Sequence, residues 1–304
     1  MAKTSSTPSR RSSPASAKRR PASSTTQRGP LAVGIVVVAI AAIITALVLI
    51  KVNGSTSSTT TVDQAVPVSI FKAVTHVPAT ALAQAGYSSA IPLTEKITGA
   101  PASLTQGGKP EVLFIGADYC PFCAAERWPL ISALSKFGTF SNLHLMKSSA
   151  SDTYANTHTF TFYKSSYTSK YISFVPVEWS TNQTTTSSNN FSGYSILQPP
   201  SKAQLKLFTK YDAAPYTTTT GAIPFIDFGN RYLQIGASYT PQVLSGLNWT
   251  TIAGALSLPT SSAGQAIDQT TNVIIATICK MTGDQPGNVC GTPTIKSITS
   301  QLGG

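Results

Sequence analysis

The chain has 304 residues, a formal net charge of +11 and only four cysteines. So few cysteines exclude a small scaffold held by many disulfides, and the chain is long enough for one large domain. Seven of the 22 basic residues lie within the first 30 positions, and without them 15 basic and 11 acidic residues leave only +4. The charge therefore indicates a basic tail, and no nucleic-acid partner is expected.

The N-terminal segment predicts a membrane protein. Residues 1–30 are rich in Ser, Thr, Pro and Ala and contain no acid, which is typical of a disordered tail. Residues 31–50 carry no charge and are long enough for a transmembrane helix, whereas a cleavable signal peptide has a shorter apolar region of about 7 to 15 residues. The positive-inside bias would then keep the tail cytosolic. A Ser/Thr-rich linker (51–64) and an extracytoplasmic domain (65–304) would follow, in a compartment where disulfides persist.

Helical and strand patterns follow one another along the rest of the chain, which is typical of an α/β fold. In the first half we expect short helices within 69–85 interrupted by Pro78, a buried strand at 111–116, a helix ending at Gly138, and strands at 143–147, 159–163 and 171–177. In the second half we expect a polar loop at 180–190, a helix at 201–211, strands at 222–228 and 231–235 around a Gly229-Asn230 turn, and a last helix at 264–281.

Two cysteines three positions apart, Cys120 and Cys123, follow the strand at 111–116. At a strand-to-helix junction Cys120 begins the helix, where unpaired N–H groups and the helix dipole favour a thiolate. Pro121 suits the first turn, because its missing N–H costs nothing there. Cys123 lies one turn deeper, close enough to form a disulfide with Cys120 and to resolve a mixed disulfide. The pair therefore predicts thiol–disulfide exchange with no cofactor.

Other interpretations of the cysteines remain open. A zinc site would need two further ligands at suitable spacing, and the two remaining cysteines and three scattered histidines offer none, so no metal is expected. A structural disulfide closing only two residues would stabilise the fold little. Cys279 and Cys290 flank a Gly-, Asp- and Pro-rich loop in the C-terminal segment 264–290. They predict a structural disulfide worth about 2 to 4 kcal/mol, with an electron relay to Cys120 as the alternative.

Four neighbours of the motif have their own predictions. Phe122 offers the thiolate no hydrogen bond, so we expect the pKa of Cys120 to lie below about 8.5 but well above about 3.5, the value of the strongest oxidases. Arg127 would raise the local positive potential. Trp128 begins the apolar stripe of the helix and is more typical of a core residue than of a substrate groove. Glu126 is more typical of a solvated surface charge than of a proton carrier.

The strand at 112–115, the motif at 120–123 and Pro224 resemble the thioredoxin-like superfamily over roughly residues 103–256. The resemblance implies that Pro224 is a cis-proline and that the backbone of Ile223 binds an extended substrate segment beside the motif. It also implies a buried acid six residues before the first cysteine, a position that here holds a phenylalanine.

About 100 residues separate the motif from Pro224, more than in a minimal thioredoxin. An insertion at about 148–214 is therefore expected, as in extracytoplasmic oxidases that insert a subdomain at this point. The fold class predicted is α/β: a thioredoxin-like fold with an insertion between the Cys-x-x-Cys helix and the cis-proline strand, preceded by a single transmembrane helix.

A longer string is more specific than the motif. The stretch YCPFCAAERW and the following ALSKFG and FSNL, all between Tyr119 and Leu143, are similar to a family of uncharacterised membrane-anchored proteins of archaea and some bacteria, a domain of unknown function. This resemblance supports the fold and the anchor and supplies no activity.

Together these patterns predict a membrane-anchored oxidoreductase that exchanges disulfides with cysteines of secreted or membrane proteins. Because a single span supplies no electrons from across the membrane, a membrane redox partner is also expected. Two alternatives belong to other classes of protein. One is a non-catalytic binding module that keeps the fold, and the other is a thiol-reducing metallochaperone for a copper or haem protein.

Overall fold

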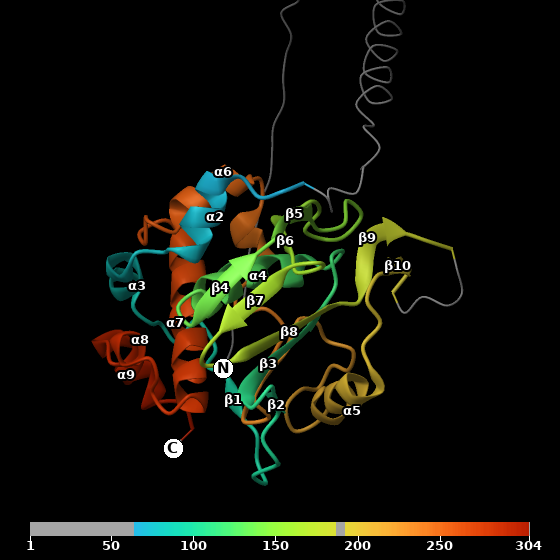
Figure 1. The fold of residues 1–304 in the computed structure, drawn as a ribbon. Coiled ribbons are helices and arrows are strands. Elements are labelled where there is room, and N and C mark those ends of the chain that lie inside the picture. Colours follow the sequence, from blue (N-terminus) through green and yellow to red (C-terminus); the bar gives the residue numbers. More distant parts are fainter. Residues whose placement is uncertain (1–63, 187–191, 304) are drawn as a thin grey trace, which may run out of the picture. The chain divides into compact units, whose positions relative to one another are not determined.

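The computed structural model describes residues 64–186 and 192–303, which form a mixed α/β domain (Figure 1). Its central sheet has the strand order β1-β12-β11-β3-β2, and β8 pairs with β3 as the sixth strand. These strands are β1 (Glu95–Lys96), β2 (Thr105–Gln106), β3 (Lys109–Gly116), β8 (Ser173–Glu178), β11 (Phe225–Phe228) and β12 (Tyr232–Ile235).

Strand β3 lies inside the sheet, with a partner strand on each side, and both of its faces are buried. It pairs antiparallel with β11 and parallel with β8. Val112 and Phe114 pack into the larger apolar cluster on one face, and Leu113 and Ile115 pack into a second cluster on the other. A continuous apolar run is what a strand covered on both sides requires, so the predicted strand at 111–116 is confirmed.

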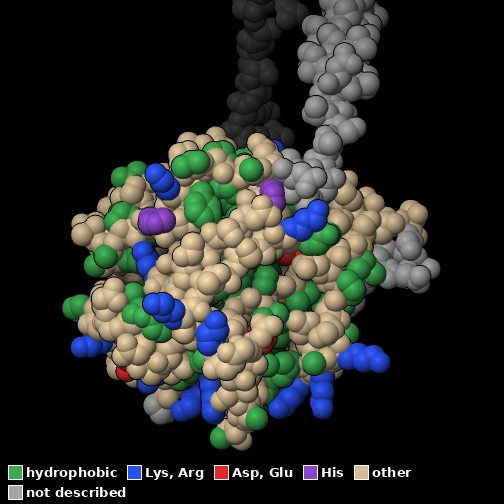
Figure 2. All heavy atoms as spheres, in the orientation of Figure 1, with side chains coloured by type: hydrophobic (Ala, Val, Ile, Leu, Met, Phe, Trp, Pro, Cys, Tyr) green, Lys and Arg blue, Asp and Glu red, His purple; other side chains and the backbone are tan. Residues whose placement is uncertain are grey.

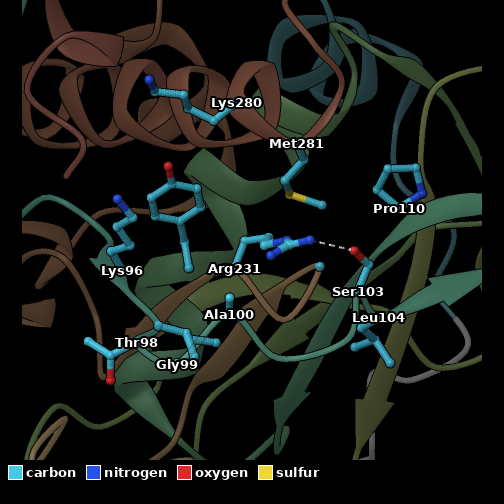
Figure 3. A pocket seen from close by; sticks show the side chains of 13 residues that line it. Lys96, Thr98, Gly99, Ala100, Ser103, Leu104, Pro110, Arg231, Lys280 and Met281 are labelled. Carbon is cyan, nitrogen blue, oxygen red and sulfur yellow. Dashed lines mark hydrogen bonds between the residues drawn. The ribbon is translucent and has the colours of Figure 1, made fainter. Parts of the chain in front are cut away.

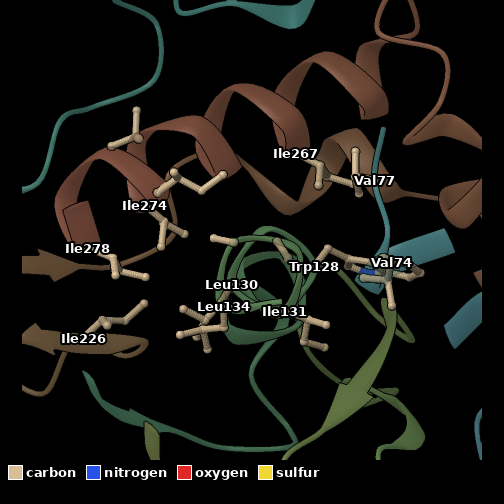
Figure 4. Close-up of a cluster of buried hydrophobic side chains, with 14 of the residues drawn as sticks. Val74, Val77, Trp128, Leu130, Ile131, Leu134, Ile226, Ile267, Ile274 and Ile278 are labelled. Carbon is tan, nitrogen blue, oxygen red and sulfur yellow. The ribbon is translucent and has the colours of Figure 1, made fainter. Parts of the chain in front are cut away.

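The larger cluster lies under a layer of helices. These are α2 (Val68–Thr75), α3 (Ala79–Ala85), α4 (Pro121–Leu134), α6 (Trp249–Ala255), α7 (Ser262–Met281), α8 (Gly287–Cys290) and α9 (Pro293–Thr299). Side chains from α4, α7 and β11 meet in this cluster, among them Leu130, Ile274 and Ile226 (Figure 4). All residues of α4 except Phe122 are buried. A helix that is buried all round in this way is surrounded by other elements.

The opposite face of the sheet is covered by α5 (Lys202–Tyr211), to the right of β8 in Figure 1. Phe208 and Tyr211 of this helix pack on the second cluster. The helix begins with a capping box, in which the Ser201 and Gln204 side chains each accept a backbone N–H. The predicted helix at 201–211 is therefore confirmed to within one residue.

Between α4 and α5 the chain forms three two-stranded antiparallel sheets, β4 (Gly138–Ser141) with β7 (Ser166–Ser169), β5 (His144–Lys147) with β6 (His158–Thr161), and β9 (Ser180–Thr184) with β10 (Tyr194–Ile196). The prediction of a polar loop from residue 180 is wrong at its start, because β9 pairs there with β10. A short 3-10 helix, η2 (Pro241–Leu244), follows β12.

The fold class predicted from the sequence needs correction. The described residues form the mixed α/β domain above rather than a thioredoxin-like domain behind a single transmembrane helix. No helix within 64–186 and 192–303 is long and apolar enough to cross a membrane. The longest of them, α7, has 20 residues but includes the polar residues Asp268, Gln269 and Asn272.

The predicted tail (1–30), span (31–50) and all but the last residue of the linker (51–64) lie outside the described residues. The predictions of a single-pass membrane protein with an extracytoplasmic domain, and of a membrane redox partner, depended on that span. Because no helix in the described part of the chain could span a membrane, these predictions of a membrane protein and of a membrane partner are wrong.

Candidate functional site

Cys120 occupies the junction between the central strand and α4. It is the residue that caps α4, and its Sγ accepts the backbone N–H of Cys123 at 3.2 Å. Pro121 is in the first turn, as the sequence predicts. The capping position has an extended backbone conformation, which turns the Cys120 side chain back over the free N–H groups of the helix. The sulfur thus lies where the backbone stabilises a negative charge.

The two thiols are free in this structure and differ in their surroundings. Cys120 is 4% exposed and Cys123 is completely buried. Burial opposes ionisation of Cys120, but hydrogen bonds from the Cys123 side chain and backbone, the charge of Arg127 and the Phe122 N–H outweigh it and lower its pKa. Burial raises the pKa of Cys123 well above its usual value, and the neighbouring Cys120 adds to this effect. The first thiol is therefore the one that ionises.

A buried ion pair lies one turn beyond the thiols. The Arg127 guanidinium donates from Nε to Glu178 Oε1 at 2.9 Å and from Nη2 to Glu178 Oε2 at 2.6 Å. Nη2 also donates to the carbonyl of Ala117 at 2.9 Å and lies 3.7 Å from Oδ1 of Asp118. None of these three side chains is exposed to solvent. The predicted positive potential of Arg127 is therefore a buried charge held by two carboxyl groups.

Asp118 is the carboxyl group whose pKa changes most in this ion-pair arrangement. Burial and the charge of Glu178 raise its pKa to about 8, against the lowering effects of Arg127 and the Thr161 side chain. Glu178 reaches the site because β8 runs parallel to β3 and places Glu178 beside Gly116. Asp118 is thus largely protonated near neutral pH, while Arg127 and Glu178 form the charged pair.

The segment before β11 flanks the first thiol. The Cys120 Sγ–H donates toward the carbonyl of Ile223 at 3.7 Å, and the peptide bond between Ile223 and Pro224 is cis. The N–H of Ile223 makes no hydrogen bond with any residue that the structure describes. The strand itself begins at Phe225 rather than at residue 222, so the proline precedes it.

Glu126 is buried rather than solvated, which corrects the sequence-based interpretation. Its Oε2 accepts the backbone N–H of Ser238 at 2.9 Å, and burial raises its pKa to about 7. The reason is the position of α4: the helix is enclosed on all sides, so a charge one turn beyond Cys123 has no access to water. Its partner Ser238 lies 112 residues further along the chain.

Aromatic side chains surround the start of α4. Phe122 is 40% exposed and packs edge-on against Tyr154 with ring centroids 5.8 Å apart. Tyr119 stacks on Tyr194 at 4.2 Å. Trp128 is completely buried and donates its indole N–H to the carbonyl of His158, which confirms the core role that the sequence favours.

The remaining cysteines form a disulfide between Cys279, near the end of α7, and Cys290 of α8. It closes a sequence separation of 11 residues and connects the C-terminal helices to α7. Both cysteines are buried. They are therefore joined to each other in a disulfide, and its structural role stays a prediction.

Sequence reasoning missed Asp118, Glu178, Ser238 and Tyr194. Asp118 carried a usable signal, because it stands two residues before Cys120 in a chain with only 11 acidic residues. The others come from β8, from the segment after β12 and from β10, and nothing near them in the sequence points to the cysteines. Only the pairing of distant strands brings them to α4.

Comparison with known proteins agrees with the narrower of the two sequence resemblances. The model of one family, described as a domain of unknown function (DUF929), matches residues 96–280, which is more than half of the 304-residue chain. The match includes β3, the cysteine pair of α4 and the segment around Pro224. No curated protein and no solved structure matches the chain. The chain belongs to the DUF929 family, a domain of unknown function.

Proposed function

We propose that the protein is a thiol:disulfide oxidoreductase that acts on cysteines of other proteins through Cys120 and Cys123. The observation that carries the proposal is the difference between the two sulfurs. Cys120 caps α4, keeps slight exposure and has a lowered pKa, whereas Cys123 is fully buried with a raised pKa. A low-pKa nucleophile beside a buried thiol is the pairing that disulfide exchange requires.

The reaction transfers two electrons without a cofactor. The Cys120 thiolate attacks one sulfur of a substrate disulfide, which forms a mixed disulfide and releases the other substrate sulfur as a thiolate. Cys123 then loses its proton and attacks Cys120, which breaks the mixed disulfide, releases the second substrate thiolate and leaves Cys120 and Cys123 as a disulfide. The same steps in reverse oxidise a substrate dithiol.

Two features support a substrate position beside the thiol. The carbonyl of Ile223 lies 3.7 Å from the Cys120 sulfur, and its N–H is not used by the described fold. An extended substrate segment would find a free backbone donor in this N–H, as in strand addition, beside the carbonyl toward which the Cys120 thiol donates. The arrangement of the motif and Pro224 also supports, as part of this proposal, a relationship of the site to the thioredoxin-like superfamily.

The test combines a trap with an equilibrium measurement on the full chain. In Cys123→Ser the mixed disulfide has no resolving thiol, so incubation with insulin should accumulate a covalent adduct at Cys120 on mass spectrometry. Cys120→Ser should give none, and Cys279→Ser/Cys290→Ser is the control that should keep exchange. Absence of adduct in a folded Cys123→Ser protein would refute the proposal.

The potential of the pair in glutathione buffers then gives the direction of exchange. A value near about −120 mV would make the protein an oxidant of dithiols, and one near about −270 mV a reductant. Tight binding of copper by Cys120 and Cys123 without adduct formation would instead favour a metallochaperone.

A further inference from the structure

A cavity of about 680 Å³ lies at the other end of the sheet from the thiols. Its walls include Lys96 of β1, Arg231 of the turn before β12 and Lys280 of α7. Figure 3 shows Lys96 and Lys280 on different walls, and Arg231 with its guanidinium bonded to Ser103. The volume is that of a pocket for a small organic molecule.

The pocket gathers positive charge without compensation. No acidic residue lines it, and all three basic side chains are exposed. Arg231 donates to Ser103 Oγ at 2.9 Å and Lys96 donates to the carbonyl of Gly303 at 3.0 Å, both neutral acceptors. Within the described part of the chain, none of the three forms an ion pair. Three like charges around one cavity repel one another, and a bound anion would remove that repulsion.

The wider distribution of charge makes this pocket stand out further. Of the ten acidic residues that the structure describes, seven are buried, whereas Arg127 is the one buried basic residue in the same ranges. The visible face in Figure 2 accordingly shows many Lys and Arg side chains and few Asp or Glu. No nearby surface carboxylate on the pocket walls therefore competes with an incoming anion.

The rest of the lining suits an organic molecule rather than a bare ion. Leu104, Met281 and the ring of Tyr232 provide apolar wall, and the hydroxyl groups of Thr98 and Ser103 provide polar contacts. Apolar walls with a few convergent charged groups are the usual composition of a small-molecule site. Arginine and lysine together favour phosphate or carboxylate oxygens.

We propose that this pocket binds a small organic polyanion carrying at least two phosphate or carboxylate groups, held by Lys96, Arg231 and Lys280. The site is separate from the thiols. It lies at the Lys109 end of β3, and the cysteines lie beyond Gly116, about 23 Å away along an eight-residue strand. The proposal therefore stands whether or not the protein exchanges disulfides.

The experiment measures anion affinity by calorimetry on the full chain at about 0.15 M salt, where charges further apart than about 8 Å are screened. Tripolyphosphate and citrate are the two probes, because they separate phosphate from carboxylate recognition. The test variant is Lys96→Gln/Lys280→Gln. The matched control is Lys202→Gln/Lys206→Gln, which removes the same charge from exposed positions on α5 outside the pocket.

The expected result is binding of at least one probe to the wild type, weakened about tenfold or more in the test variant and less than about twofold in the control. Preference for tripolyphosphate or for citrate identifies the anionic group. Equal weakening in both variants would show diffuse attraction to a basic surface and overturn the proposal, as would no binding of either probe. Because the substituted lysines are exposed, both variants should keep the wild-type unfolding temperature.

Discussion

The buried guanidinium of Arg127 connects the stability of the domain to the chemistry of Cys120. It holds Glu178 through two hydrogen bonds, and its charge helps to lower the pKa of Cys120. Breaking a buried pair by removing one partner costs about 3–5 kcal/mol, because the other charge stays buried and uncompensated. Arg127→Met should therefore destabilise the domain by about this amount, measured by urea unfolding, and shift alkylation of Cys120 to higher pH.

The double variant Arg127→Met/Glu178→Met separates charge from packing. Apolar groups of similar volume in place of a buried pair are often neutral or stabilising, so much of the lost free energy of unfolding should return. Alkylation of Cys120 should remain shifted to higher pH in the double variant, because the positive charge is still missing. A double variant as unstable as the single one would show that packing, not the ion pair, decides the stability.

At the scale of single residues, the sequence predicted the thiols well and their surroundings poorly. The position of Cys120 at the start of a helix followed from local rules on strands, proline and helix ends, and so did the burial of Trp128. Glu126 was misjudged because its burial depends on Ser238 and other distant segments. Glu178 was missed for the same reason, since it lies 51 residues from Arg127.

Among the elements, the close pairing of β4 with β7 depends on a single glycine. A Cβ on Gly138 would collide with the Thr168 carbonyl and lie 2.6 Å from Tyr167 Oη and 2.7 Å from Ser169 Cβ. Overpacking of this kind costs about 1–3 kcal/mol. Gly138→Ala should therefore lower the free energy of unfolding by about that amount, measured by urea denaturation.

Gly254 of α6 is the matched control, because a Cβ there meets nothing within 4 Å. Alanine is favoured over glycine in a helix by up to about 1 kcal/mol, so Gly254→Ala should leave stability unchanged or raise it. If Gly138→Ala were as stable as Gly254→Ala, β7 would have to move away from β4 at no cost, contrary to this prediction.

Helices and strands that depend on local sequence were predicted correctly, and those that depend on distant pairing were not. The helices α5 and α7, and the β11–β12 hairpin with its Gly229-Asn230 turn, were visible from caps, periodicity and turn residues. In the sequence Gly138 marks the end of a helix, but in the structure it begins strand β4 and pairs with Ser169, 31 residues further on. Strand β9 was taken for a loop because its residues are polar. They form a strand because they pair with β10, which local sequence does not indicate.

For the domain as a whole, the notable property is that most acids are inside. Burial raises the pKa of Asp118 to about 8 and the pKa values of Glu126, Asp227 and Asp268 to about 7. Unfolded, these groups ionise near about pH 4. Between the two values the folded domain binds more protons than the unfolded chain, so its stability must fall as pH rises.

The prediction is that the free energy of unfolding is greatest near pH 4 to 5 and decreases toward pH 8, which urea titrations at fixed ionic strength would measure. Asp268 offers the cleanest test, because it is buried away from the thiols on α7 and neither of its oxygens accepts a hydrogen bond from a described residue. Asp268→Asn cannot ionise, so the dependence should flatten by on the order of 1 kcal/mol per pH unit between about pH 5 and 6.5. Stability that is constant or rises from pH 5 to 8 would mean that these carboxyl groups are ionised in the folded domain. For Asp268, the charge of Lys136, which favours the ionised carboxylate, would then outweigh the cost of burial.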